Sequence, residues 1–174
     1  MQLEELGLLD GERWELIEGE LLRQMPKKRP HVHALAILTE WLISIFGGRF
    51  VNVEAPIDVS PEDNPTNEPQ PDLIVLRPDY QDPWSRTPQP GDLLLVIEVS
   101  DSTLEFDLMV KAGLYARASI LEYWVLDLRG RRLIVHREPA NGHYSSTVAY
   151  SEEENVSPLS FPAARLAVRS VFPG

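Results

Sequence analysis

The spacing of apolar residues along the chain predicts two helices. Between residues 31 and 46, large apolar side chains recur at the three- and four-residue intervals of an amphipathic helix, and a Gly-Gly pair at 47–48 ends it. The segment STLE at 102–105 matches a capping box, so a second helix is predicted from there to about residue 118.

Short apolar runs bounded by proline, glycine or polar residues predict the strands. Two of them flank the turn at 18–20 and form a hairpin; the others lie at 50–53, 57–59, 72–76, 92–100, 122–128, 132–137 and 144–150. Proline-rich loops are predicted at 60–71 and 77–91. The order indicates an α/β (α+β) fold, a mixed sheet with helices packed on it around one core.

Length and composition indicate one ordinary globular domain spanning 1–174, since the hydrophobic fraction is 43% and the charged fraction 25%. The absence of cysteine excludes disulfides and a cysteine nucleophile, and it suits a reducing cytoplasm. The acidic N-terminus does not resemble a secretory signal peptide. The longest apolar stretches, around 34–46 and 93–99, are too short to span a bilayer, so no membrane association is expected.

The net charge of −11 argues against a protein that coats nucleic acid, because neutralising phosphates requires lysine and arginine. It does not exclude a nuclease, whose carboxylates can be offset by a bound metal ion.

Glu98 is the first candidate for chemistry. A period of two along the strand at 93–100 places it on the same face as Leu94 and Val96, and a carboxylate in such an apolar row needs a compensating cation, donor or proton. Asp72 opens another apolar strand, DLIVL. If the two strands are neighbours, the two carboxylates can bind one hard cation such as Mg²⁺.

The predicted second helix adds Asp107, Lys111 and Tyr115, which share one helix face. A returning helix can bring Lys111 back over the end of the strand that carries Glu98, where an ammonium group can position water and stabilise charge. Simpler interpretations make Asp72 a turn or salt-bridge residue, Asp107 and Lys111 an exposed ion pair, and Tyr115 a core residue.

Several motifs together resemble the Uma2 family, a branch of the PD-(D/E)XK restriction-endonuclease-like nucleases. They are RWELIEGELLRQMP, PQPDLIVL, LLLVIEVSDST, DLMVKAGLYA, LEYWVLD and ARLAVRSVF, and the likeness runs from about residue 11 to 173. The resemblance implies a restriction-endonuclease-like mixed central sheet flanked by helices, with an N-terminal β-hairpin.

The resemblance also implies roles for particular residues. Asp72 corresponds to the aspartate of the PD motif and Glu98 to the (D/E)XK acid, and Val99 would offer its backbone carbonyl to the metal. Ser100 stands where the motif lysine usually lies, and Lys111 corresponds to a lysine displaced to the helix.

The opening segment offers Glu15 or Glu18 as an additional acidic ligand, and the sequence does not choose between them. His31 matches a recurrent histidine of the family, although a residue at the start of a helix is the simpler interpretation. The remaining histidines, which show no partner pattern, are interpreted as structural: His33, His136 and His143.

The sequence supports two hypotheses about function. The first is a Mg²⁺- or Mn²⁺-dependent endonuclease that hydrolyses DNA phosphodiester bonds, with a homodimer expected because cutting both strands needs two centres. The second is a non-catalytic interaction or nucleic-acid-binding protein that retains the nuclease fold, which the acidic composition favours.

Overall fold

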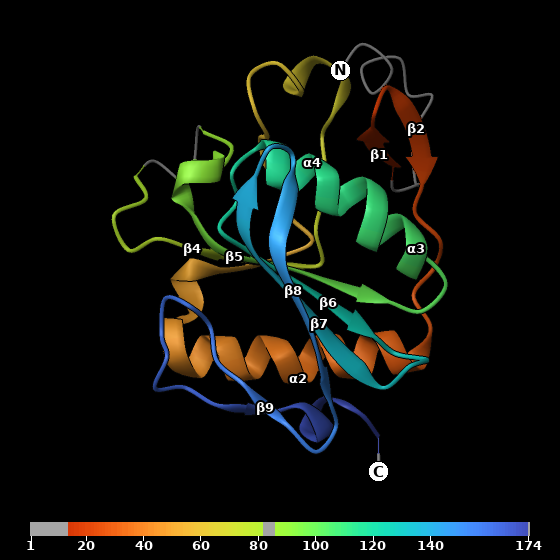
Figure 1. Ribbon diagram of the computed structural model, residues 1–174, viewed down its shortest axis with the longest axis vertical. Coiled ribbons are helices and arrows are strands. Elements are labelled where there is room, and N and C mark those ends of the chain that lie inside the picture. The colour runs from red at the N-terminus through yellow and green to blue at the C-terminus, as the bar shows by residue number, and fades with distance from the viewer. Residues whose placement is uncertain (1–13, 82–85, 174) are drawn as a thin grey trace.

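A six-stranded mixed sheet with helices on both faces forms the body of the protein in the computed structural model, which describes residues 14–81 and 86–173 (Figure 1). The strand order is β3-β4-β5-β6-β7-β8. The expectation that the first residues do not form a secretory signal concerns residues 1–13, which lie outside the described part, as do 82–85 of the second proline-rich loop. Within the described ranges, no helix has the length and apolar character needed to cross a bilayer.

The N-terminal hairpin and the first long helix follow the predicted pattern. Strands β1 (Trp14–Ile17) and β2 (Glu20–Arg23) pair antiparallel. Glu18 and Gly19 between them have φ angles of 49° and 80°, as a two-residue hairpin turn requires. Helix α2 (Arg29–Phe46) ends at Gly47, whose φ of 88° is a conformation that glycine adopts without strain.

The predicted mixed sheet is confirmed, with one parallel pair, β5 and β6, among antiparallel neighbours. Its strands are β3 (Val51–Val53), β4 (Leu73–Leu76), β5 (Leu93–Ser100), β6 (Glu122–Asp127), β7 (Arg132–Ala140) and β8 (His143–Ser151). The chain crosses from β5 to β6 through α3 (Leu104–Phe106), η4 (Asp107–Lys111) and α4 (Ala112–Arg117). Strands β9 (Asn155–Val156) and β10 (Leu166–Ala167) form a separate small ladder, and short 3₁₀ turns lie at η1 (Gly48–Phe50), η2 (Asn64–Thr66), η3 (Pro90–Asp92) and η5 (Val168–Val171).

The sheet divides the apolar interior in two, where the sequence predicted one core. One cluster packs between the sheet and α2, and the other between the sheet and α4. The alternation predicted for β5 holds from Leu95 onward but fails at its start. A register shift between Val75 and Leu76 puts Leu93 in the same cluster as Val96, so Leu93 faces α4 rather than α2.

The strand predicted at 57–59 is wrong, although its apolar side chains are buried as expected. The backbone N–H of Ile57 donates to the carbonyl of Pro69 at 3.1 Å, whereas that of Val59 donates to the side chain of Asn64 at 2.7 Å. The buried backbone groups find separate partners in loops, so burial of this segment needs no ladder.

The second helix begins differently from the prediction. The capping box expected at 102–105 does not form: Thr103, and not Ser102, is the N-cap residue, and no side chain caps the backbone there. The hydroxyl of Thr103 donates to the Asp107 carboxylate at 2.7 Å. The helix then contains a π-helical turn, η4, between α3 and α4. Turns of this kind widen the helix and are common at functional sites.

His136 is a buried histidine outside the helices. It lies on β7, its ring stacks on Tyr123 with centroids 5.5 Å apart, and its Nδ1 lies 3.0 Å from the hydroxyl of Thr147. Within the described ranges its buried Nε2 has no hydrogen-bond partner. Burial lowers the pKa of His136 to about 4, because the charged imidazolium is poorly solvated there.

We therefore expect His136 to make folding depend on pH between about 6.5 and 4. The pKa is depressed in the folded state, so the stability that the neutral ring provides is present above the unfolded pKa and is lost as the pH falls. From pH 7 to pH 5 the wild type should lose about 2 kcal/mol more than His136→Phe does. Urea unfolding at both pH values measures this difference. A matched variant at exposed His143 should follow the wild type, and parallel pH profiles for wild type and His136→Phe would contradict the expectation.

Candidate functional site

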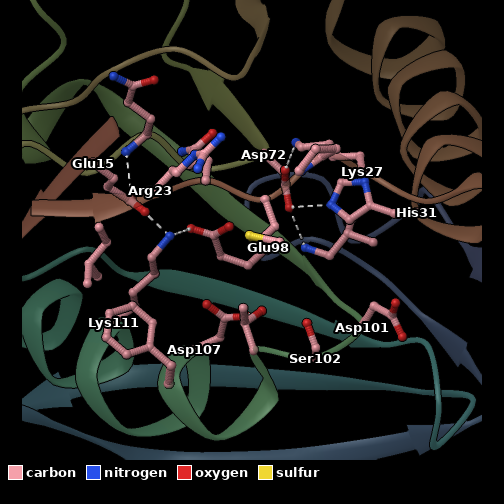
Figure 2. A pocket seen from close by; sticks show the side chains of 18 of the residues that line it. Glu15, Arg23, Lys27, His31, Asp72, Glu98, Asp101, Ser102, Asp107 and Lys111 are labelled. Carbon is pink, nitrogen blue, oxygen red and sulfur yellow. Dashed lines mark hydrogen bonds and ion pairs between the residues drawn. The ribbon is translucent and has the colours of Figure 1, made fainter. Parts of the chain in front are cut away.

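A cavity of about 500 Å³ lies where the hairpin, the loop before α2, the ends of β4 and β5, and the start of the second helix meet (Figure 2). Acidic and basic side chains from all of these elements line it. They are Glu15, Arg23, Lys27, Lys28, His31, Asp72, Glu98, Asp101, Asp107 and Lys111.

Asp72 and Glu98 are brought together by the pairing of β4 with β5. The antiparallel register joins Leu73 to Ile97, so the next positions along the two strands are Asp72 and Glu98. Both are buried, with exposed fractions of 7% and 5%. Asp72 Oδ2 also accepts a hydrogen bond from the backbone N–H of Val99 at 2.8 Å, which fixes the carboxylate at the strand end.

Lys111 forms a buried ion-pair bridge. Its Nζ lies 2.8 Å from Glu98 Oε1 and 2.8 Å from Glu15 Oε1, and its exposed fraction is 5%. The hydroxyl of Tyr115, one turn further along the helix, donates to the same Glu98 oxygen at 3.2 Å. Lys111 and Tyr115 therefore share the helix face that looks onto Glu98, as the spacing predicted, and Tyr115 is also the core residue that was expected.

The interpretation of Asp107 and Lys111 as an exposed ion pair is wrong, because both side chains are buried. The carboxylate of Asp107 accepts hydrogen bonds from the hydroxyls of Ser100 and Thr103. Ser100, at the position of the usual motif lysine, thus ties the end of β5 to the π-helical turn. These contacts hold the turn against the strand and so aim Lys111 at Glu98.

The structure separates the two candidate acids of the opening segment. Glu15 lies in the site, where its Oε1 accepts the N–H of Gln70 at 2.9 Å in addition to its contact with Lys111. Glu18 lies in the hairpin turn and pairs with Arg117, and 47% of its side chain is exposed. Of the two, only Glu15 can act on the site directly.

Two basic residues complete the surroundings of Asp72. His31 Nε2 lies 3.2 Å from Asp72 Oδ2, so this histidine faces the site in spite of the simpler interpretation. Lys27, for which the sequence suggested no role, forms ion pairs with both Asp72 and Glu54. One signal was present in the sequence: the chain has three lysines, and two of them meet these acids.

The two central carboxylates have opposite electrostatic environments. Burial raises the pKa of Glu98 well above its ordinary value, although the nearby charge of Lys111 opposes this. Burial also disfavours the charged form of Asp72, but the hydrogen bond from His31 and the charge of Lys27 outweigh it and lower the pKa of Asp72 to about 2. The carboxylate of Glu98 is therefore less well compensated by nearby positive charge than that of Asp72.

Lys111 stays charged in this environment. Burial acts to lower its pKa, but the charges of Glu98 and Glu15 outweigh burial and raise the pKa above the ordinary lysine value. Burial raises the pKa of Asp107, whose partners are two neutral hydroxyls and the more distant charge of Lys111.

The donors at the end of β4 and β5 are of the type that a hard divalent cation requires. Asp72, Glu98 and the carbonyl of Val99 all offer oxygen. Within residues 14–81 and 86–173, the contacts of Glu98 with Lys111 and Tyr115 both reach its Oε1. In the same part of the chain, no three His, Asp or Glu side chains are arranged so that they could hold a metal ion by themselves. A site here would therefore need the backbone carbonyl of Val99 as a further ligand. A dication would supply the charge that buried Glu98 lacks.

Comparison with known proteins identifies the family and the fold. The model of the Uma2 family, described as "Putative restriction endonuclease", matches residues 2–169. A solved structure described as "a putative nuclease belonging to DUF820 from Anabaena variabilis ATCC 29413" superimposes with a TM-score of 0.67. The two sequences are 16% identical, and the match covers 91% of this chain and 89% of that one. No curated protein matches.

Proposed function

The chain belongs to the Uma2 family of nuclease-like proteins, and from that membership we propose that it is a divalent-metal-dependent endonuclease that hydrolyses phosphodiester bonds in DNA. One observation supports this most directly. A buried lysine, Lys111, is held against Glu98 within the same cavity as Asp72. A structural core gains little from burying such charged groups together, whereas a metal-dependent phosphodiesterase can use two acids to bind a cation and an ammonium to stabilise charge.

The proposed ligands of the cation are Asp72, Glu98 and the backbone carbonyl of Val99. A Mg²⁺ or Mn²⁺ ion bound there would polarise a phosphate and lower the pKa of a bound water molecule. Lys111 would direct its ammonium at the attacking water or at a phosphate oxygen, where it stabilises the charge that develops during displacement. Glu15 and Tyr115 would act by positioning, since Glu15 contacts Lys111 and Tyr115 contacts Glu98.

We expect the wild-type protein to nick supercoiled plasmid DNA in the presence of Mn²⁺ or Mg²⁺, and to stop when EDTA is added. Mn²⁺ should also raise the melting temperature, because a ligand that binds only the folded state stabilises it by about 2.7 kcal/mol at one hundred times its dissociation constant. Agarose gel electrophoresis and thermal melts measure the two effects. The Asp72→Asn, Glu98→Gln double variant is the control, and an equal Mn²⁺ shift in both proteins would contradict the site.

The alternative, a non-catalytic protein that keeps the fold, has one observation in its favour. Asp72 already has an ion pair with Lys27 and a hydrogen bond with His31, so this carboxylate has partners without metal. A wild-type protein that binds Mn²⁺ but leaves plasmid and single-stranded DNA intact would support that alternative. The proposed enzyme would work on duplex DNA as a homodimer in the cytoplasm, and sedimentation analysis would measure its oligomeric state.

A further inference from the structure

Lys27 occupies an unusual position among the charged groups of the cavity. It lies in the loop between β2 and α2, and its ammonium forms ion pairs with Asp72 Oδ1 and with Glu54. Figure 2 shows Lys27 and Lys111 approaching the pair of acids from opposite sides. Lys111 is held by a helix and is 6% exposed at its side chain, whereas the side chain of Lys27 is 23% exposed and belongs to a loop.

A cation on Asp72 and the ammonium of Lys27 would compete for the same charge. Asp72 Oδ2 already accepts the Val99 N–H and faces His31, so Oδ1 is the oxygen that Lys27 shares with any incoming ion. Two positive charges on one carboxylate oxygen repel each other at close range. Binding of a divalent cation therefore favours release of Lys27 from Asp72.

A released Lys27 has an obvious anionic partner in a nuclease. Its side chain lines the cavity that also contains Asp72 and Glu98, so it can reach a group bound in front of those acids. Lysine binds phosphate as a flexible point charge on a long stem, and the loop position leaves this stem free to turn. Glu98, Glu15 and Asp107 share the charge of Lys111, so exchanging Lys27 for a dication adds positive charge beside a group of buried acids.

We propose that Lys27 is a phosphate-binding residue of the site, and that it exchanges Asp72 for a backbone phosphate of the nucleic acid when a divalent cation takes its place on that carboxylate. The inference rests on the proposed nuclease function. Lys27 thereby acts twice. It lowers the affinity for metal in the free protein, and it adds affinity for the nucleic acid in the metal-bound protein.

The first measurement is Mn²⁺ affinity of the protein alone, by isothermal titration calorimetry. Lys27→Gln should bind Mn²⁺ about tenfold more tightly than the wild type, because the competing charge is gone. Lys28→Gln is the matched control. Lys28 pairs with Asp101 at 3.2 Å and is 69% exposed, so its loss should change Mn²⁺ affinity by less than about twofold.

The second measurement is binding of a phosphorothioate-linked DNA 12-mer at saturating Mn²⁺, by fluorescence anisotropy. In about 0.1 M salt, Lys27→Gln should bind it about tenfold more weakly, and the slope of log affinity against log salt should fall by about one. Lys27→Arg retains a cation that can contact phosphate, so it should keep most of the wild-type affinity for this DNA.

The two results must occur together in Lys27→Gln, tighter Mn²⁺ binding and weaker binding of the 12-mer. Unchanged or weaker Mn²⁺ binding would overturn the proposal, and so would unchanged DNA binding. If the wild type binds Mn²⁺ and nicks plasmid while Lys27→Gln fails either test, the inference fails and the nuclease function stands. If the wild type binds no Mn²⁺, both fail.

Discussion

Replacing Lys111 with methionine is expected to lower the free energy of unfolding by about 3–5 kcal/mol, measured by urea denaturation at pH 8 with EDTA. The ammonium lies 2.8 Å from both Glu98 and Glu15, and all three side chains are buried. Methionine fills a similar volume but leaves two carboxylates without their cation. The simpler interpretation of the sequence, an exposed pair with Asp107, would predict a change of less than about 1 kcal/mol.

Two further variants separate this cause from a general loss of packing. Lys28→Met removes a lysine whose ion pair is exposed, and it should cost at most about 1 kcal/mol. Adding Glu98→Gln to Lys111→Met removes one of the uncompensated charges, so the double variant should be more stable than Lys111→Met. A cost below about 1 kcal/mol for Lys111→Met would mean that the buried bridge is absent in solution.

Replacing Glu98 with glutamine is expected to reduce metal-dependent DNA cleavage by about 10³-fold, which corresponds to about 4 kcal/mol of lost transition-state stabilisation. Glutamine keeps the shape and can still accept from Tyr115, and Lys111 retains Glu15 as its partner. The fold should therefore survive, and the rise in melting temperature with Mn²⁺ should shrink. Initial rates of plasmid nicking and thermal melts measure the two effects.

The two acids of the hairpin provide graded controls for Glu98. Glu15→Gln weakens the hold on Lys111 without removing a proposed metal ligand, so we expect a loss of about tenfold in rate. Glu18→Gln removes an exposed partner of Arg117 and should cleave as the wild type does. Cleavage by Glu98→Gln within tenfold of the wild-type rate would remove Glu98 from the proposed mechanism.

Much of this arrangement could be predicted from local patterns. The apolar strands that carry Asp72 and Glu98 were predicted from the sequence. Because these strands are adjacent in the sheet, the two acids are neighbours. The helical spacing placed Lys111 and Tyr115 on one face, and the loop length between β5 and the helix allowed that face to return to Glu98.

The errors have physical causes that local patterns do not contain. The burial of Lys111 could not be judged from helical spacing, because one of the two acids that enclose it, Glu15, comes from β1, far away in the sequence. The register shift that moves Leu93 to the other face arises from pairing with β4. Lys27 was missed because a loop has no periodicity from which the direction of a side chain can be predicted. Its direction is set by ion pairs with Glu54 and Asp72, which come from other parts of the chain.

The hydrogen bond from the Val99 N–H to Asp72 gives this aspartate a structural role that is independent of any reaction. It continues the pairing of β4 and β5 one position beyond Leu73, with a side chain in place of a backbone carbonyl. A descendant of this protein that had lost its activity would still lose stability on replacing the residue with an apolar one. An aspartate at this position is therefore weak evidence of a working enzyme. Within the described residues, Lys27 makes no comparable hydrogen bond to the sheet, so stability would not preserve it once activity is lost.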